Sequence, residues 1–313
     1  MQADFDSCGE KRERALKCLI DNARKKSKES ESVVSSWPGV VNARVDGGTG
    51  FLPGYVPFIG VDYFSEQTQG RRILAYAMSQ NLRGNENFAV GWAQDFQSGT
   101  GVEALDRQNR RYSAPRSRCI SIMMYPFDTG HVPILCAIVR HLLDEAKANE
   151  SSIYSEISAT NLSKFSFCTA DHRKTQDCDE SFLRCWDWFS RLEIEVLEPD
   201  YILCCGKRVS RIVRTKIQEV KDGLRAPVLL DVAFPSLRVI NKWYRKQKEN
   251  EVSSKDECIA RIMAMLSQDD LNLRIKCKSP KDVTVKDVIA RDIWYFASMH
   301  ESLRDQLKGT TAV

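Results

Sequence analysis

The middle of the chain alternates short apolar runs with amphipathic segments, and this alternation constrains the fold more than any other feature. The apolar runs predict strands over residues 55–60, 156–161, 201–205 and 228–234. Between them, apolar residues recur at helical spacing over residues 132–147, 182–196 and 209–220. Strands separated by helices favour a parallel sheet with helices on both faces. The sequence therefore predicts an α/β fold, a three-layer α/β/α arrangement around a central, mostly parallel four-stranded sheet.

The flanking segments predict further elements around this sheet. Residues 10–32 have the pattern of a charged helix that lies on the surface or frays, residues 71–82 that of a helix, and residues 84–118 that of long loops. A capping box of Ser254 and Glu257 predicts a helix to residue 266, followed by a half-buried strand over 271–277 and a helix over 284–307. We expect an N-terminal extension (1–50), an α/β domain (51–250) and a C-terminal helix-strand-helix extension (251–313) that packs on the same domain.

The composition supports a folded core and sets the expected compartment. Hydrophobic residues make up 42% and charged residues 28% of the 313 residues, which excludes wholesale disorder. A net charge of +4 permits a local basic face without requiring a nucleic-acid partner. The N-terminal segment is too charged for a secretory signal, and the apolar stretches are shorter than a membrane span. Because the eleven cysteines are an odd number in a long chain, we expect free, mostly buried thiols in a cytoplasmic protein.

Three of the predicted strands end in residues that can carry chemistry. Asp62 follows the first strand, Asn161 ends the second, and residues 234–236 (Phe-Pro-Ser) end the last. In open α/β sheets, ligands bind beyond the carboxyl ends of the strands. These residues are therefore expected to border one ligand site.

Four segments that contain these residues resemble motifs of the uracil-DNA glycosylase superfamily, in the family's order. Gly60–Phe64 (GVDYF) is similar to its water-activating motif, and Thr160–Phe165 (TNLSKF) to the strand end that reads the flipped base. The run from Cys185 through LEPDYILCCGKRV resembles the helix, strand and glycine before the phosphate-side helix. Ala233–Ser236 (AFPS) lies where the family has His-Pro-Ser. The resemblance covers about residues 54–245 and implies a uracil-DNA glycosylase-like domain.

The resemblance implies a monofunctional DNA glycosylase, which flips a base from DNA, hydrolyses its N-glycosidic bond and leaves an abasic site. Asp62 would stabilise the cation that develops on the sugar and orient the water, and Asn161 would pair with the edge of the base. The candidate base-binding residues are Asn161, Tyr63, Phe64 and Phe234, and the candidate DNA-binding residues are Ser236, Arg238, Lys207, Arg208, Lys242 and Arg245. The expected partner is single- or double-stranded DNA, bound by a monomer without a cofactor or a membrane.

Each candidate also has a structural alternative. An aspartate or asparagine after a strand commonly caps or forms a turn, aromatic residues beside a strand are usually core residues, and the basic residues suit a solvated helix face. Cys185 matches one position of the iron–sulfur ligands of some family members, but Phe165 occupies another. Cys168, Cys178 and Cys185 with His172 fit no zinc spacing, so we expect no bound metal.

The chain departs from the family at the histidine that stabilises the departing base, where Phe234 stands. Losing such a donor typically costs about a hundred- to a thousandfold in rate. We therefore expect Arg238 to replace it, or the substrate to be a better leaving group than uracil. The chain between Asp62 and Asn161 is longer than compact family members need, which favours a bulky base. We predict a hypermodified pyrimidine of phage DNA, excised in antiviral defence.

Two other classes of function fit the sequence. One is a catalytically inactive glycosylase-fold protein that binds DNA or a modified base, which the missing histidine favours and the retained aspartate disfavours. The other is a small-molecule α/β enzyme, such as a nucleotide-binding or N-ribosyl hydrolase protein. Against the latter, the chain has no GxGxxG, GxxxxGK[ST] or GxSxG motif.

Overall fold

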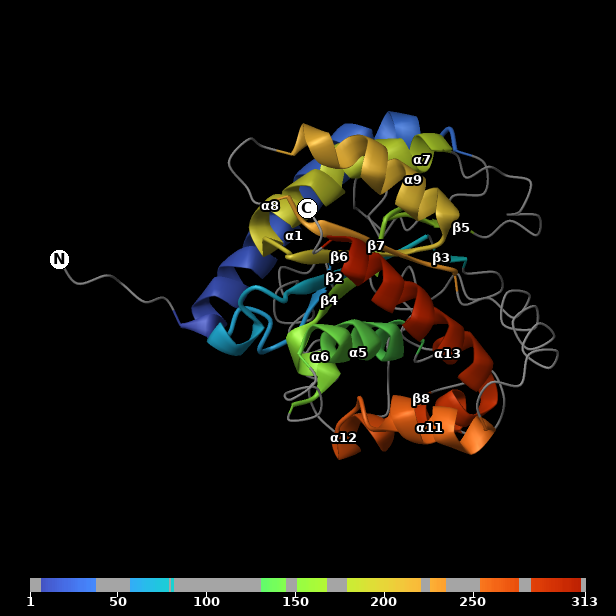
Figure 1. Cartoon of the computed structure of the whole chain (residues 1–313). Coiled ribbons are helices and arrows are strands. Elements are labelled where there is room, and N and C mark those ends of the chain that lie inside the picture. Colours follow the sequence, from blue (N-terminus) through green and yellow to red (C-terminus); the bar gives the residue numbers. More distant parts are fainter. Residues whose placement is uncertain are drawn as a thin grey trace.

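The computed structural model describes residues 7–37, 57–78, 80–81, 131–144, 151–167, 179–220, 226–234, 254–275 and 283–310. Within these ranges the chain is an α/β protein built on a mixed sheet of five strands (Figure 1). Across the sheet the strands are β1 (Phe58–Ile59), β4 (Ser158–Asn161), β2 (Ile73–Ala77), β6 (Tyr201–Cys205) and β7 (Val228–Val232). Strands β4, β2, β6 and β7 are parallel, whereas β1 runs antiparallel to β4.

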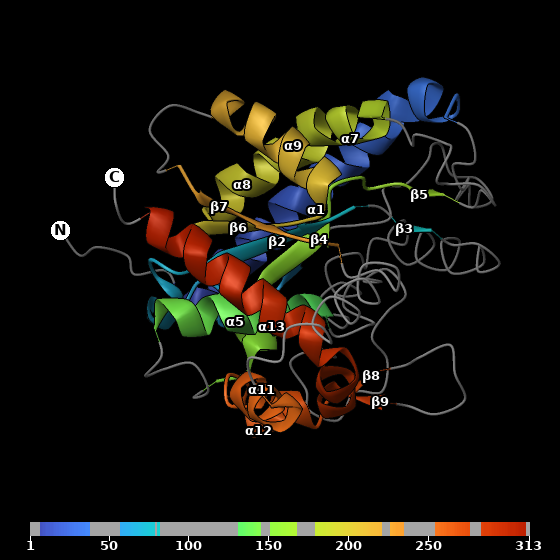
Figure 2. The ribbon, with the colours of Figure 1, turned by 45° about the vertical axis from the view of Figure 1, so that its right-hand side comes forward.

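Helices cover both faces of this sheet, as Figures 1 and 2 show from two sides. One face carries α1 (Cys8–Val34), α7 (Asp179–Cys185), α8 (Arg191–Leu197) and α9 (Lys207–Lys216), with a π-helical turn (Trp186–Ser190) between α7 and α8. The other face carries α5 (His131–Leu143) and α13 (Val285–Thr310), and α11 (Lys255–Met263) packs on α13. The short elements are η1 (Glu66–Thr68), α6 (Ile153–Glu156), η5 (Ile217–Glu219), α12 (Gln268–Leu271), and the pairs β3 (Gln80–Asn81) with β5 (Ser166–Phe167) and β8 (Arg274–Ile275) with β9 (Val283–Thr284).

Burial on both faces explains why the central strands are continuous apolar runs. In β2, Ile73 and Ala75 pack into the core beneath α5 and α13, and Leu74 and Tyr76 into the core beneath α1 and α7. The same alternation places Leu203 and Cys204 of β6 in opposite cores. The predicted strands at β6 and β7 are confirmed for residues 201–205 and 228–232.

The predicted helix over residues 71–82 is wrong, because this segment forms β2 at the centre of the sheet. All five residues of β2 are buried. A fully buried strand shows no alternation of polar and apolar residues, so its run of Ile, Leu, Ala and Tyr resembles a short buried helix.

The sheet is mostly parallel, as predicted, but it has five strands rather than four, because β2 is a strand and not a helix. The predicted strand at β1 is present, but it runs antiparallel at the edge of the sheet. Near the C-terminus, the predicted strand over 271–277 is shorter, since Leu271 ends α12 and β8 begins at Arg274. The capping box of Ser254 and Glu257 is confirmed at the start of α11. The predicted loops over 84–118 lie outside the described residues.

The N-terminal helix is longer than predicted and is more than a surface helix. The inner face of α1 buries Leu16, Leu19, Ile20 and Ala23 in the same core cluster as Leu74 of β2. The charged residues that dominate its sequence lie on the other side, so the helix is amphipathic.

Candidate functional site

The parallel strands β4, β2, β6 and β7 all end at one edge of the sheet, which we call the carboxyl edge. Asn161 ends β4 at one side of this edge and Phe234 follows β7 at the other. Three strand spacings separate the two, so the edge between them is about 14 Å wide. The β3–β5 pair continues beyond this edge, where Figure 2 shows it projecting from the sheet.

Asn161 has an unsatisfied polar atom at the carboxyl edge. Its residue is 2% exposed, and its side-chain Oδ1 is buried without a hydrogen-bond partner. Leaving a buried acceptor unpaired costs about 1–3 kcal/mol, so such groups call for a specific explanation. A ligand with an N–H group would supply the missing donor.

Gly206 brings the ends of three strands together at the centre of the edge. Its φ of 108° lies in a region that glycine alone adopts readily. A Cβ at this position would lie 3.3 Å from Phe234 Cβ and 3.8 Å from Met78 Sδ. The close approach of these residues therefore requires glycine.

The N-terminus of α9 follows Gly206 and places two predicted DNA-binding residues at the carboxyl edge. Lys207 is exposed, while the half-buried Arg208 guanidinium lies 5.8 Å from the Phe182 ring centroid. Helix N-termini attract anions, and these side chains add positive charge at the same place.

A buried ion pair fixes the loop after β4. Lys164 Nζ lies 2.6 Å from Glu193 Oε1 and donates to Thr160 Oγ1 at 2.7 Å. The Tyr76 hydroxyl is within hydrogen-bond distance of two acceptors, Glu193 Oε2 at 2.9 Å and Ser190 O in the π-helical turn at 3.3 Å. Burial lowers the pKa of Lys164, against the opposing effect of Glu193. With its charged groups paired in this way, the cluster holds the loop in place.

Cys185 belongs to the same structural cluster rather than to a metal site. Its Sγ accepts the Lys164 N–H at 3.3 Å, and burial raises the pKa of its thiol to about 12. A neutral buried thiol is a poor metal ligand. Among the described residues no group of His, Cys, Asp and Glu could hold a metal. Cys168, His172 and Cys178 lie outside the described residues.

Sequence reasoning missed a histidine–aspartate pair on the α5 and α13 face. His131 Nε2 donates to Asp292 Oδ2 at 2.9 Å, and Arg291 also donates to this carboxylate, at 2.7 Å. The His131 ring lies 6.0 Å from the ring of Tyr295, whose hydroxyl donates to Ala233 O at the end of β7. The pair therefore lies near the carboxyl edge. No sequence spacing could have revealed it, because 161 residues separate the partners.

The pair has one free ring nitrogen. His131 Nδ1 is buried without a hydrogen-bond partner. With Nε2 donating to the carboxylate, Nδ1 keeps a lone pair that can accept a proton. Asp292 has non-helical torsions (φ −110°, ψ 24°) and kinks α13 at this point.

Asp62 lies at the opposite edge, where the parallel strands begin and which we call the amino edge. Because β1 is antiparallel, Ile59 pairs with Ser158, three residues before Asn161, about 10 Å along the strand. The chain then continues away from Asn161, and the Asp62 N–H donates to Ser155 O at 2.8 Å. The structure therefore does not bring Asp62 and Asn161 to one site, contrary to expectation from the strand ends.

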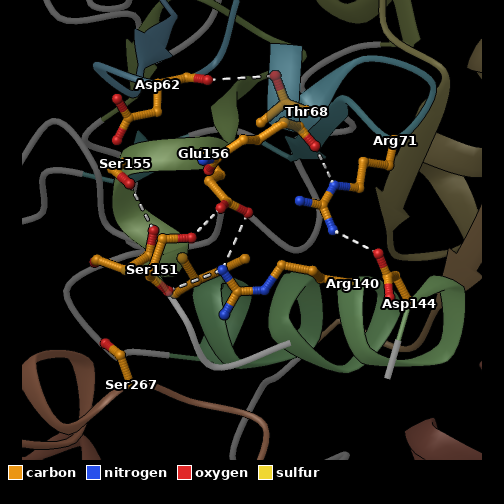
Figure 3. A network of polar contacts seen from close by, with 12 residues as sticks. Asp62, Thr68, Arg71, Arg140, Asp144, Ser151, Ser155, Glu156 and Ser267 are labelled. Atoms are coloured by element: carbon orange, nitrogen blue, oxygen red, sulfur yellow. Dashed lines mark hydrogen bonds and ion pairs between the residues drawn. The ribbon is translucent and has the colours of Figure 1, made fainter. Parts of the chain in front are cut away.

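The Asp62 side chain makes no hydrogen bond or ion pair to the described residues, and the residue is exposed. The Thr68 hydroxyl donates to the main-chain oxygen of Asp62, at 3.3 Å, and not to its carboxylate (Figure 3). Gly60, in the same segment, has a packing role, because a Cβ there would overlap the Ser155 carbonyl. These contacts give the GVDYF segment a structural explanation.

The neighbouring aromatic residues also lie at the amino edge. Tyr63 is fully buried, Phe64 is half-buried, and their rings meet edge to face at 5.0 Å. The other predicted DNA-binding residues, Ser236, Arg238, Lys242 and Arg245, lie outside the described residues. Of the predicted set, the structure thus brings Asn161, Lys207, Arg208 and Phe234 to one edge and leaves Asp62, Tyr63 and Phe64 at the other.

Comparisons with protein-family models, curated proteins and solved structures found no match. Among the described helices, none is long and apolar enough to span a membrane.

Proposed function

We propose that the chain is a divergent, uracil-DNA glycosylase-like protein that binds a base flipped from DNA at the carboxyl edge and hydrolyses its N-glycosidic bond. The buried, unpaired carbonyl of Asn161 carries this proposal. An N–H group on the edge of a base would satisfy it, and the asparagine amide can pair with such an edge.

Several features support a glycosylase-like, three-layer arrangement. Four of the sheet strands are parallel, and helices lie on both faces. The TNLSKF segment, Gly206 with the basic start of α9, and Phe234 all meet the same edge, where ligands bind in such sheets. The GVDYF segment lies at the amino edge instead.

The position of Asp62 changes the proposed chemistry. Hydrolysis at the carboxyl edge needs a group there that orients water, and Asp62 is at the other end of β4. Glu193 is already paired with Lys164. We assign the role to His131, which Asp292 orients and whose Nδ1 has a lone pair for the proton of the water. The products are then a free base and an abasic site.

The proposed substrate remains a bulky modified base, such as a hypermodified pyrimidine of phage DNA. The base would lie over the carboxyl edge, near the side chains of Met78 and Phe234 beside Gly206. The basic start of α9 would then contact the flanking phosphates.

The test is a base-excision assay on DNA panels that carry uracil, hypoxanthine, alkylated bases or phage-type modified cytosines, scored by abasic sites. We expect wild type to cleave one panel. The Asn161→Ala and His131→Gln variants should lose about 100-fold or more in rate, and Asp62→Ala should keep it. Circular dichroism verifies the fold of each variant. Loss of cleavage in Asp62→Ala alone would place the active site at the amino edge and overturn the proposal.

A second candidate function is binding without cleavage, and the distance of Asp62 from Asn161 favours it. In that case no panel is cleaved, while DNA with one modified base binds wild type more tightly than Asn161→Ala. Fluorescence anisotropy with matched modified and unmodified oligonucleotides measures this difference. Equal affinity of both proteins for both DNAs would exclude the binding candidate as well.

A further inference from the structure

A cavity of about 370 Å³ opens at the amino edge, away from the site proposed above. Three parts of the chain form its walls: α1, the segment between β1 and β2, and the end of α8. Its lining includes Lys11, Arg14, Phe64, Arg72, Val196 and Glu198. Its volume falls in the lower range of small-molecule sites, which is about 300–1,000 Å³.

The charges around the cavity favour an anion. Lys11, Arg14 and Arg72 contribute three positive charges, and Glu198 contributes one negative charge. Lys11 is exposed and forms no ion pair with the described residues. The Glu198 side chain is 60% exposed, so solvent screens its charge. The net charge of the lining therefore matches a dianion.

Arg72 is held in place for such a ligand. Its main-chain N–H donates to Asp200 Oδ2 at 3.0 Å, and its carbonyl accepts the N–H groups of Asp200 and Tyr201. Its guanidinium lies 5.5 Å from the Phe64 ring centroid and 3.6 Å from Glu198, although Nε is buried without a hydrogen-bond partner. A guanidinium with an unsatisfied buried N–H is a ready donor to an oxyanion.

A second unsatisfied donor is near Arg72 but is not part of the cavity lining. The Tyr63 hydroxyl is fully buried without a partner. Burial raises the pKa of Tyr63 well above its usual range, while the nearby Arg72 charge opposes the shift. The phenol is therefore neutral and keeps its proton to donate.

The remaining walls are apolar. Phe64, Val196 and Ala15 line the cavity beside the charged groups. We propose that this cavity is a second site, which binds a small ligand that joins a dianionic phosphate to a flat apolar group, as in a nucleoside monophosphate. The cations bind the phosphate, and the apolar wall around Phe64 packs against the base. This site is independent of the function proposed for the carboxyl edge.

The test is isothermal titration calorimetry of the full chain with four nucleoside 5′-monophosphates, the matched nucleosides and inorganic phosphate. We expect saturable one-to-one binding of at least one monophosphate and weaker binding of its nucleoside. The double variant Lys11→Gln/Arg14→Gln should weaken binding by about tenfold or more, because two charge-assisted contacts are lost. The matched control is Lys17→Gln, an exposed lysine of α1 outside the lining, and it should bind like wild type.

A second variant tests the apolar wall. Phe64→Leu should weaken the binding of the monophosphate more than the binding of inorganic phosphate. Absence of saturable binding up to about 1 mM, or equal affinity of the double variant and wild type, would overturn the proposal. So would weakened DNA binding in the double variant without any monophosphate binding, which would make the cavity part of a DNA surface. Base excision and modified-base binding by the double variant test the function proposed for the carboxyl edge, and both should be unchanged because the substitutions are at the cavity.

Discussion

The buried carboxylates around α6 have several hydrogen-bond partners, whereas two buried side-chain atoms at the carboxyl edge have none, although the Tyr154 hydroxyl of α6 is also buried without a partner. Around α6, Glu156 accepts from Arg140 at 3.1 Å and from Ser151 (Figure 3). Asp270 accepts from the Ser152 hydroxyl and the Ile153 N–H. These bonds join α5, α6 and α12 beside the start of β4. At the carboxyl edge, the Asn161 carbonyl and His131 Nδ1 are buried without partners.

The difference separates a structural network from a candidate site. Buried carboxylates that accept several hydrogen bonds stabilise a fold when each partner is in place. Buried groups without partners destabilise the fold, and proteins keep such local conflicts chiefly at functional sites. We therefore attribute the paired carboxylates around α6 to stability, and the unpaired Asn161 carbonyl is in keeping with the ligand site that we propose at the carboxyl edge.

The largest expected effect concerns the Lys164–Glu193 ion pair near the carboxyl edge, whose charged groups are buried and paired like those around α6. Glu193→Ala leaves Lys164 buried without its carboxylate, and we expect it to lower the free energy of unfolding by about 3–5 kcal/mol. Urea denaturation measures the loss. The double variant Lys164→Met/Glu193→Leu should recover most of it, because apolar residues replace both charges. A double variant no more stable than Glu193→Ala would show that the pair is not the source of the loss.

The next prediction compares one glycine at each edge. Gly206→Ala should cost about 2–3 kcal/mol, since its backbone conformation excludes other residues and the Cβ presses on Phe234. Gly70 also has a positive φ, 80°, but a Cβ there meets nothing within 4 Å. Gly70→Ala should therefore cost only about 1 kcal/mol. Thermal and urea unfolding of both variants test the order, and equal losses would contradict it.

The sequence allowed β4, β6 and β7 to be predicted as strands, but neither the strand β2 nor the direction of β1. Runs such as Tyr201–Cys205 are apolar and end in glycine or proline, so local chemistry marks both their type and their end. A two-residue strand such as Phe58–Ile59 carries no local mark of orientation, which is set by its pairing with β4. The direction of β1 determines where Asp62 lies. The residues that we expected at one site are therefore found at opposite edges of the sheet.

The paired side chains were beyond sequence reasoning for a similar reason. Lys164 lies in the loop after β4 and Glu193 on α8, and only the tertiary fold brings them together. His131 and Asp292 are 161 residues apart in the sequence. Lysine, glutamate, histidine and aspartate residues are usually exposed. The sequence therefore gives no indication that these four side chains are buried.

A pH-dependent prediction tests the histidine–aspartate pair. Burial acts to raise the pKa of Asp292, but hydrogen bonds from His131 and Arg291 outweigh it and hold the pKa below its usual 3.8. The carboxylate therefore stabilises the fold above that pH, and the contribution is lost as the pH falls through the lowered pKa. Asp292→Asn should cost about 1–2 kcal/mol at pH 7, and its difference from wild type should shrink below the usual pKa. Urea unfolding across this pH range gives the curve, and a difference independent of pH would exclude the ionised form as the cause.

The smallest expected effect tests the assignment of Asp62 to a structural turn. Asp62→Asn changes an exposed carboxylate that has no partner among the described residues, so the free energy of unfolding should change by no more than about 0.5 kcal/mol. The main-chain bonds to Ser155 and Thr68 survive the substitution. Glu156→Gln, which weakens the buried pair with Arg140, serves as the comparison and should cost several times more, because its partner is 2% exposed. A loss for Asp62→Asn as large as that for Glu156→Gln would give the Asp62 carboxylate a structural role and remove the contrast between the exposed turn and the buried α6 network.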